Sequence, residues 1–90
     1  MNKIFHERGY EDFLYWATQD KKIFKRIADL IKDIERNGVM TGIGKPERLK
    51  YGGGYSQRID EKNRLVYDIE ENILIIKSCK GHIWIKYLNL

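Results

Sequence analysis

The spacing of apolar residues changes once along this chain, and that change constrains the fold more than any other feature. Apolar side chains recur at helical spacing up to residue 37, whereas from residue 55 they form three short runs typical of strands. Short polar breaks separate these runs, which favours antiparallel hairpins. With a short strand at residues 3–6, we predict an α+β domain of order β-α-α-β-β-β, with two helices packed on an antiparallel sheet.

Two helices are expected in the first half of the chain. The helix at residues 8–19 has an apolar face formed by Tyr10, Phe13, Leu14 and Ala17. Asp20 is a suitable N-cap for the second helix, and Asn37-Gly38 is a suitable stop. The second helix carries a longer apolar stripe, which consists of Ile23, Phe24, Ile27, Leu30, Ile31 and Ile34.

The predicted strands lie at residues 55–60, 64–69 and 73–80. The third run begins with four consecutive apolar residues, which predicts a central strand covered on both faces. The side chains that we expect to be buried are Phe13, Ile27, Leu30, Ile34, Leu65 and Ile75.

Arg58 and Arg64 flank the first predicted hairpin turn. A loop with an odd number of residues allows them to lie directly opposite each other on one face of the sheet. A two-residue loop places them on opposite faces instead. The sequence leaves this register open.

Length and charge indicate one soluble domain over residues 1–90 with an anionic partner. The chain is 42% hydrophobic and 33% charged, and its net charge is +4. This charge favours nucleic acid or an acidic protein as partner, although it is also compatible with a basic surface that only confers solubility. No apolar run is long enough for a membrane span, and the N-terminus lacks the apolar core of a signal peptide. We therefore expect a cytoplasmic protein without a membrane partner.

Cys79 is the only cysteine, so an intrachain disulfide is impossible. His6 and His82 lie far apart in the sequence and form no zinc-ligand pattern, so we expect neither a metal nor a cofactor. The favoured interpretation of Cys79 is a small buried residue on a strand, and a catalytic thiol is the alternative.

The candidate functional residues combine proton transfer with anion binding. Glu47 and His82 can move protons in opposite directions, and the cations Lys50, Arg58 and Arg64 can hold a phosphate. Such a set suits RNA cleavage, in which the 2′-hydroxyl loses a proton and the leaving 5′-oxygen gains one. Alternatively, Glu47 forms an exposed ion pair of ~0–1 kcal/mol, and His82 is structural.

Six segments of the chain carry a resemblance to a known family. The chain resembles the YoeB/Txe toxins, within the RelE superfamily of bacterial toxin–antitoxin systems, over residues 3 to 82. The segments are Asp12-Phe13-Leu14-Tyr15-Trp16, Ile31-Lys32-Asp33-Ile34, Gly44-Lys45-Pro46-Glu47-Arg48-Leu49-Lys50, Tyr55-Ser56-Gln57-Arg58-Ile59, Asn63-Arg64-Leu65-Val66-Tyr67 and Ser78-Cys79-Lys80-Gly81-His82.

The resemblance implies an endoribonuclease that cuts messenger RNA in the ribosomal A site. It also implies a partner antitoxin of the YefM type and a homodimer. By motif position, Glu47 would be the general base, His82 the general acid, and Arg64 the group that stabilises the phosphorane. Lys50 and Arg58 would help to hold the phosphate.

Two positions depart from the family pattern. A tyrosine usually follows the histidine directly, but here Ile83 follows His82 and residues 83–90 form an atypical extension. We expect this extension to place Trp84 or Tyr87 near His82, or to be an addition without a catalytic role. Gln57 also occupies a position that is often basic in the family. The alternative function is therefore a non-catalytic binding module of the same fold, acting on RNA or a protein.

Overall fold

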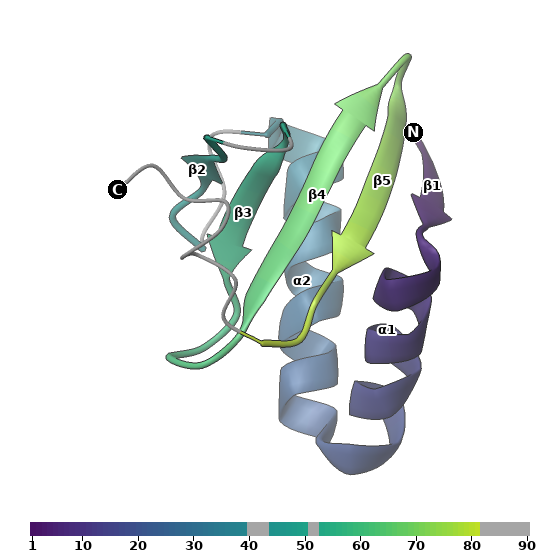
Figure 1. Cartoon of the computed structure of the whole chain (residues 1–90), viewed down its shortest axis with the longest axis vertical. Coiled ribbons are helices and arrows are strands. Elements are labelled where there is room, and N and C mark those ends of the chain that lie inside the picture. The colour runs from purple at the N-terminus through teal and green to yellow at the C-terminus, as the bar shows by residue number, and fades with distance from the viewer. Residues whose placement is uncertain (40–43, 51–52, 82–90) are drawn as a thin grey trace.

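Five strands form one sheet, and both helices pack against the same face of it (Figure 1). The computed structural model describes residues 1–39, 44–50 and 53–81. The sheet order is β1-β5-β4-β3-β2. The predicted α+β fold is confirmed. Its elements are β1 (Asn2–Phe5), α1 (Glu7–Gln19), α2 (Lys21–Asn37), β2 (Glu47–Arg48), β3 (Tyr55–Arg58), β4 (Arg64–Glu70) and β5 (Ile73–Ser78).

The sheet differs from the prediction in two details. The strand β1 pairs with β5 in parallel, so the sheet is mixed rather than purely antiparallel. Parallel neighbours need a long crossover connection, and the two helices lie between β1 and β5 in the chain. The strand β2 was not predicted, because its two residues are too few to show a period.

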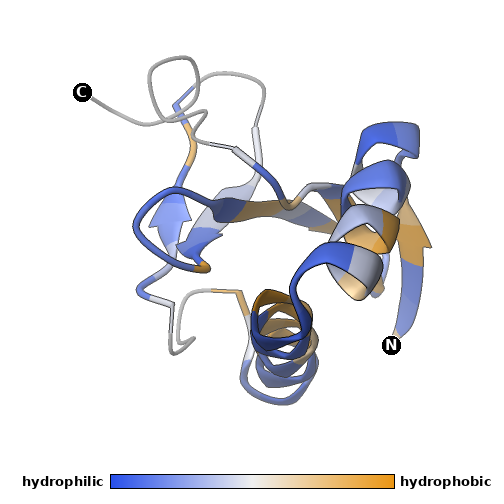
Figure 2. Ribbon diagram, turned by 90° about the horizontal axis from the view of Figure 1, so that it is seen from below, coloured by the Kyte–Doolittle hydropathy of each residue, from blue (hydrophilic) through white to orange (hydrophobic). Residues whose placement is uncertain are grey.

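The predicted ends of α2 are confirmed. The Asp20 carboxylate accepts hydrogen bonds from the backbone N–H groups of Lys22 and Ile23, at 3.0 and 3.1 Å. At the other end Gly38 has a φ of 97°, which favours glycine, and its N–H donates to the Ile34 carbonyl. The apolar side of α2 faces the sheet, and its polar side faces away (Figure 2). Within the described ranges, neither helix is long and apolar enough to cross a bilayer.

The buried side of α1 is not the one that its apolar spacing predicts. Tyr10 and Leu14 are exposed, at 54% and 48%. The buried residues of this helix are Gly9, Asp12 and Trp16. The helix is therefore rotated so that a glycine and a carboxylate face the sheet.

Close contact with β5 explains this rotation. A Cβ at Gly9 would overlap the carbonyl oxygen of Ile76, so glycine lets α1 approach the strand closely. Asp12 and Trp16 are buried there, and the hydrogen bonds that both form to the backbone of Cys79 offset the cost of burying their polar groups. A prediction from the spacing of apolar residues does not assign a glycine or an aspartate to the core.

Four of the six predicted core residues are fully buried, namely Ile27, Leu30, Ile34 and Leu65. Ile75 is only half-buried, because alternation along β5 directs Leu74 and Ile76 toward the helices instead. The strand β5 does lie inside the sheet, but its second face is not covered by a helix (Figure 1). The prediction of a last strand covered on both faces is therefore wrong.

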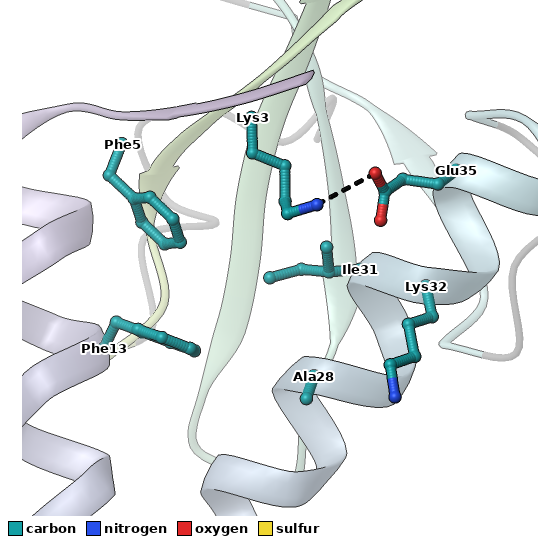
Figure 3. Close-up of a pocket in the computed structure, with 7 residues that line it drawn as sticks. All are labelled: Lys3, Phe5, Phe13, Ala28, Ile31, Lys32 and Glu35. Carbon is teal, nitrogen blue, oxygen red and sulfur yellow. Dashed lines mark hydrogen bonds and ion pairs between the residues drawn. The ribbon is translucent and has the colours of Figure 1, made fainter. Parts of the chain in front are cut away.

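Phe13, the other half-buried residue, lines a pocket between β1, α1 and α2 (Figure 3). Its ring lies between those of Phe5 and Phe24, with centroids 5.1 and 4.7 Å away. Lys3 and Glu35 form an ion pair of 3.0 Å beside the pocket. The pocket volume is about 260 Å³, and the pocket is a hollow in the surface between the helices and β1.

The full burial of Ile27 leads to a prediction about stability. Ile27→Ala should lower the free energy of unfolding by about 2–5 kcal/mol, because it leaves a cavity at a fully buried site. Urea unfolding followed by circular dichroism measures this change. Leu14→Ala is the control, since this half-exposed residue should change stability by only about 0.5 kcal/mol. An unchanged unfolding midpoint for Ile27→Ala would contradict the assignment of the core.

Candidate functional site

Two arginines lie side by side on the sheet face opposite the helices. In the β3–β4 hairpin Arg58 is directly opposite Arg64, so both side chains belong to the same face. The five-residue connection from Ile59 to Asn63 confirms the odd-loop alternative. Two adjacent guanidinium groups repel each other, and folding alone gives no reason to place them together.

Asp60 fixes the turn that sets this register. Its Oδ1 accepts hydrogen bonds from the backbone N–H groups of Lys62 and Asn63, at 2.8 and 2.7 Å. The N–H of Ile59 donates to the carbonyl of Asn63 at 2.9 Å. A side chain that binds the backbone two and three residues later closes a defined turn, which leaves little freedom for the strands to slip.

Glu47 reaches the same face from the neighbouring strand. It pairs with Ser56 across β2 and β3, and Ser56 shares a face with Arg58 by alternation. Its Oε2 lies 3.9 Å from Nη2 of Arg64. The Glu47 side chain is 53% exposed, whereas that of Arg64 is 10% exposed. A carboxylate open to solvent is thus held next to a guanidinium that is largely shielded from water.

The charged guanidinium of Arg64 has a hydrogen-bond donor without a partner in the described residues. Its Nε donates to the Ser56 hydroxyl at 3.0 Å, while Nη2 is buried without a hydrogen-bond partner in the described part of the chain. Burial, with a smaller contribution from Arg58, lowers the Arg64 pKa, and Glu47 acts in the opposite direction. The guanidinium remains charged at neutral pH. An unsatisfied buried donor costs about 1–3 kcal/mol, so an anion that reached this nitrogen would remove that cost.

A buried network holds the chain that leads into β2. The Gly44 N–H donates to Oε1 of Gln57 at 3.0 Å, and the Arg58 N–H donates to the Gly44 carbonyl at 2.8 Å. Nε2 of Gln57 donates to the Tyr67 hydroxyl, which in turn donates to the Val39 carbonyl. Gln57 is fully buried on the helix-covered face, so its amide has a structural role.

Side chains of α1 hold the segment that follows β5. The Asp12 carboxylate accepts from the Cys79 N–H at 3.0 Å, and the Trp16 indole donates to the Cys79 carbonyl at 2.8 Å. Arg8 donates to the Lys80 carbonyl at 3.2 Å and to the Asp12 carboxylate. The chain therefore leaves the sheet along a fixed path.

This path ends beside the arginine pair. The Gly81 N–H donates to Oδ1 of Asn63 at 2.8 Å, and its carbonyl accepts from the Arg64 N–H at 3.2 Å. His82 and residues 83–90 lie outside the described residues, and so does Tyr51. Lys50 is exposed just beyond β2. Of the predicted site residues, the structure thus brings together Glu47, Arg58 and Arg64.

Cys79 is not a candidate nucleophile. It is fully buried, and burial, with a contribution from Asp12, raises the pKa of its thiol to about 12. Since the thiolate is the reactive form, a thiol with this pKa is inert at neutral pH. The prediction of a small buried residue is confirmed, although Cys79 lies just after the end of β5 rather than on the strand.

Sequence reasoning missed two polar residues of the site, Ser56 and Asn63. Both are buried, at 1% and 8% exposure, and both bind groups next to the proposed chemistry. Ser56 could have been found from strand alternation, because it lies two residues before Arg58 and shares its face. No comparable signal marks Asn63.

Sequence comparison adds a family match to this geometry. The family model of the YoeB-like toxin of bacterial type II toxin–antitoxin systems matches residues 5–83. Toxin YoeB of Escherichia coli K12 is 44% identical over 84 residues, which are 91% of this chain and 99% of the relative. Toxin YoeB of Streptomyces coelicolor is 43% identical over the same length, with the same coverage of both chains.

Solved structures agree with the sequence match. The YoeB dimer from Staphylococcus aureus has a TM-score of 0.85 and 46% identity, and the alignment covers 91% of this chain and 97% of that one. The YoeB–YefM complex from the same organism has a TM-score of 0.85, 45% identity and the same coverage. The YoeB/ParE toxin from Agrobacterium tumefaciens has a TM-score of 0.86 and 30% identity, with 91% and 99% coverage. This chain therefore belongs to the family of YoeB-like toxins of bacterial type II toxin–antitoxin systems.

Proposed function

We propose that this toxin is an endoribonuclease that cuts messenger RNA in the ribosomal A site. The observation that carries the proposal is the placement of Arg58 directly opposite Arg64, with Glu47 3.9 Å from the Arg64 guanidinium, on the sheet face opposite the helices. This arrangement can accept a proton and neutralise a phosphate at the same place. The chemistry is attack of a ribose 2′-oxygen on the adjacent phosphorus.

Each residue has a role in that reaction. Glu47 accepts the 2′-hydroxyl proton, for which its half-exposed carboxylate is accessible. Arg64 stabilises the charge that builds up on the phosphorane, and Arg58 and Lys50 hold the phosphate. His82 donates a proton to the leaving 5′-oxygen. The hydrogen bond from the Arg64 N–H to the Gly81 carbonyl supports this assignment, because Gly81 directly precedes the histidine.

An exposed site gives a physical reason for dependence on the ribosome. Glu47 and Arg58 are exposed, and they lie on the sheet face opposite α1 and α2 (Figure 1). Such a face does not by itself force a flexible RNA into the in-line geometry that the attack requires. A messenger held by the ribosome arrives with this geometry already imposed, and positioning of this kind supplies much of a rate enhancement. The isolated toxin should therefore be a slow nuclease of the bacterial cytoplasm.

The proposed partner is an antitoxin of the YefM type. The Staphylococcus aureus relative has been solved both as a dimer and with YefM, including a heterotetrameric complex. We propose the same two associations here, with acidic and apolar antitoxin side chains covering Glu47, Arg58 and Arg64. Acidic groups would satisfy the buried Nη2 of Arg64, which lacks a partner in the described residues.

The general base can be tested by Glu47→Gln, which keeps the shape and removes the proton acceptor. Cleavage on programmed ribosomes should fall by roughly 10²–10⁴, while ribosome binding changes little. Toe-printing of a messenger on translating ribosomes measures the cleavage. Glu70→Gln is the matched control, because it removes the same charge from an exposed position at the far end of β4. Near-normal cleavage by Glu47→Gln would remove Glu47 from the mechanism.

The same assay separates the enzyme from a non-catalytic binding module. The replacement of the family tyrosine by Ile83 favours the module. If the unmodified chain binds ribosomes without any cleavage, the module is the correct function.

The arginines can be tested by changing geometry and charge separately. Arg64→Lys keeps the charge but loses the planar fork, so it should reduce the cleavage rate more than the affinity for RNA. Arg58→Ala and Lys50→Ala should weaken RNA association and make it less sensitive to salt. Single-turnover cleavage and binding titrations at several salt concentrations measure these effects. An Arg64→Ala variant that binds weakly but cleaves at the normal single-turnover rate would show that its role is wrongly assigned.

Antitoxin binding should stabilise the toxin against heat. A partner that binds only the folded state raises stability by about 2.7 kcal/mol at a concentration of 100 times Kd. Differential scanning calorimetry of the toxin alone and of the complex measures the shift in Tm. The complex should also be inactive on ribosomes. An active complex would contradict the proposal that the antitoxin covers the arginine pair.

A further inference from the structure

We infer that Ser56 is a positioning residue for Arg64, and this inference rests on the proposed function. Ser56 holds the guanidinium in the orientation in which it can receive the phosphate. It also holds that guanidinium beyond hydrogen-bond distance of Glu47. Nothing in the family match or in the proposed roles assigns a task to this serine.

The sheet fixes the Ser56 hydroxyl in space. Ser56 lies within β3, opposite Glu47 of β2 on one side and Val66 of β4 on the other. It is 1% exposed, so water does not compete for its hydroxyl. The Oγ accepts a hydrogen bond of 3.0 Å from Nε of Arg64. The backbone on both sides thus determines where the acceptor lies.

This one hydrogen bond controls the plane of the guanidinium. The group is a rigid fork, so binding its Nε also sets the directions of the two terminal nitrogens. One of these, Nη2, is buried without a partner in the described residues and lies 3.9 Å from Oε2 of Glu47. That separation is longer than a hydrogen bond, so the base and the cation are near each other without being joined.

The neutrality of serine matters for this task. An aspartate at position 56 could bind Nε equally well, but it would neutralise the charge that the phosphorane requires. A hydroxyl fixes the direction of the donors and leaves the positive charge available. Without the hydroxyl, the long arginine side chain can turn and form a closer pair with Glu47. Such a pair would occupy the proton acceptor and the cation together.

The test compares Ser56→Ala with the matched control Ser78→Ala, which removes another buried serine hydroxyl from β5. Nitrogen-15 NMR follows exchange of the Arg64 Nε–H proton with water, a measurement that does not depend on activity. We expect faster exchange in Ser56→Ala and no change in Ser78→Ala. On programmed ribosomes, kcat should fall about tenfold in Ser56→Ala with KM nearly unchanged. Ser56→Thr keeps the hydroxyl and should restore most of the rate.

A double variant shows whether the serine acts through the arginine. In an Arg64→Ala background, Ser56→Ala should reduce cleavage no further. If both backgrounds lose the same factor, or if the Nε–H exchange is unchanged in Ser56→Ala, the inference is wrong. Should Ser56→Ala fail to fold, Ser56→Cys fills the site with a weak acceptor, and the same two readouts apply to it. Absence of cleavage by the unmodified chain would instead refute the proposed function, and the exchange measurement would still decide the contact.

Discussion

The register between β3 and β4 is the constraint on which the rest of this site depends. A shift by one residue would turn Arg64 to the helix-covered face and bring Leu65 out of the core. The Asp60 turn and the burial of Leu65 therefore support the same pairing. Folding and function are linked here, because the contacts that bury the core also place a charged donor on the opposite face.

Buried polar side chains, rather than apolar ones, connect the loops to this sheet. The amide of Gln57 and the hydroxyl of Tyr67 hold the chain before β2, and Asp12 and Trp16 hold the chain after β5. Each of these groups is satisfied by the backbone of a segment without regular structure. Such groups are expensive to bury without partners, so they favour one path of the chain over many similar ones. The segment before β2 is thus held by side chains of the sheet, and the segment after β5 by side chains of α1.

The sequence predicts the features that depend on local chemistry, but not those that depend on contacts between distant segments. Element order, the Asp20 cap and the Gly38 stop were predictable because they depend on local spacing and local chemistry. The face of α1 was not, since it is set by Gly9 against Ile76, a contact between distant segments. The placement of Glu47 beside Arg64 required a two-residue strand that has no period of its own. Local signals thus predicted the order and the ends of the elements, whereas long-range contacts determine how Glu47, Arg58 and Arg64 meet.

The close approach at Gly9 has a consequence for how such a toxin can be lost. An added methyl group would collide with the Ile76 carbonyl and push α1 outward. Asp12 and Trp16 would move with the helix and release the backbone of Cys79, which leads to the histidine. A single substitution at Gly9 would therefore be enough to inactivate the toxin in a cell that has lost the antitoxin. Inactivating mutations should therefore accumulate at this glycine, on the helix side of the sheet, as well as at Glu47, Arg58 and Arg64 on the opposite face.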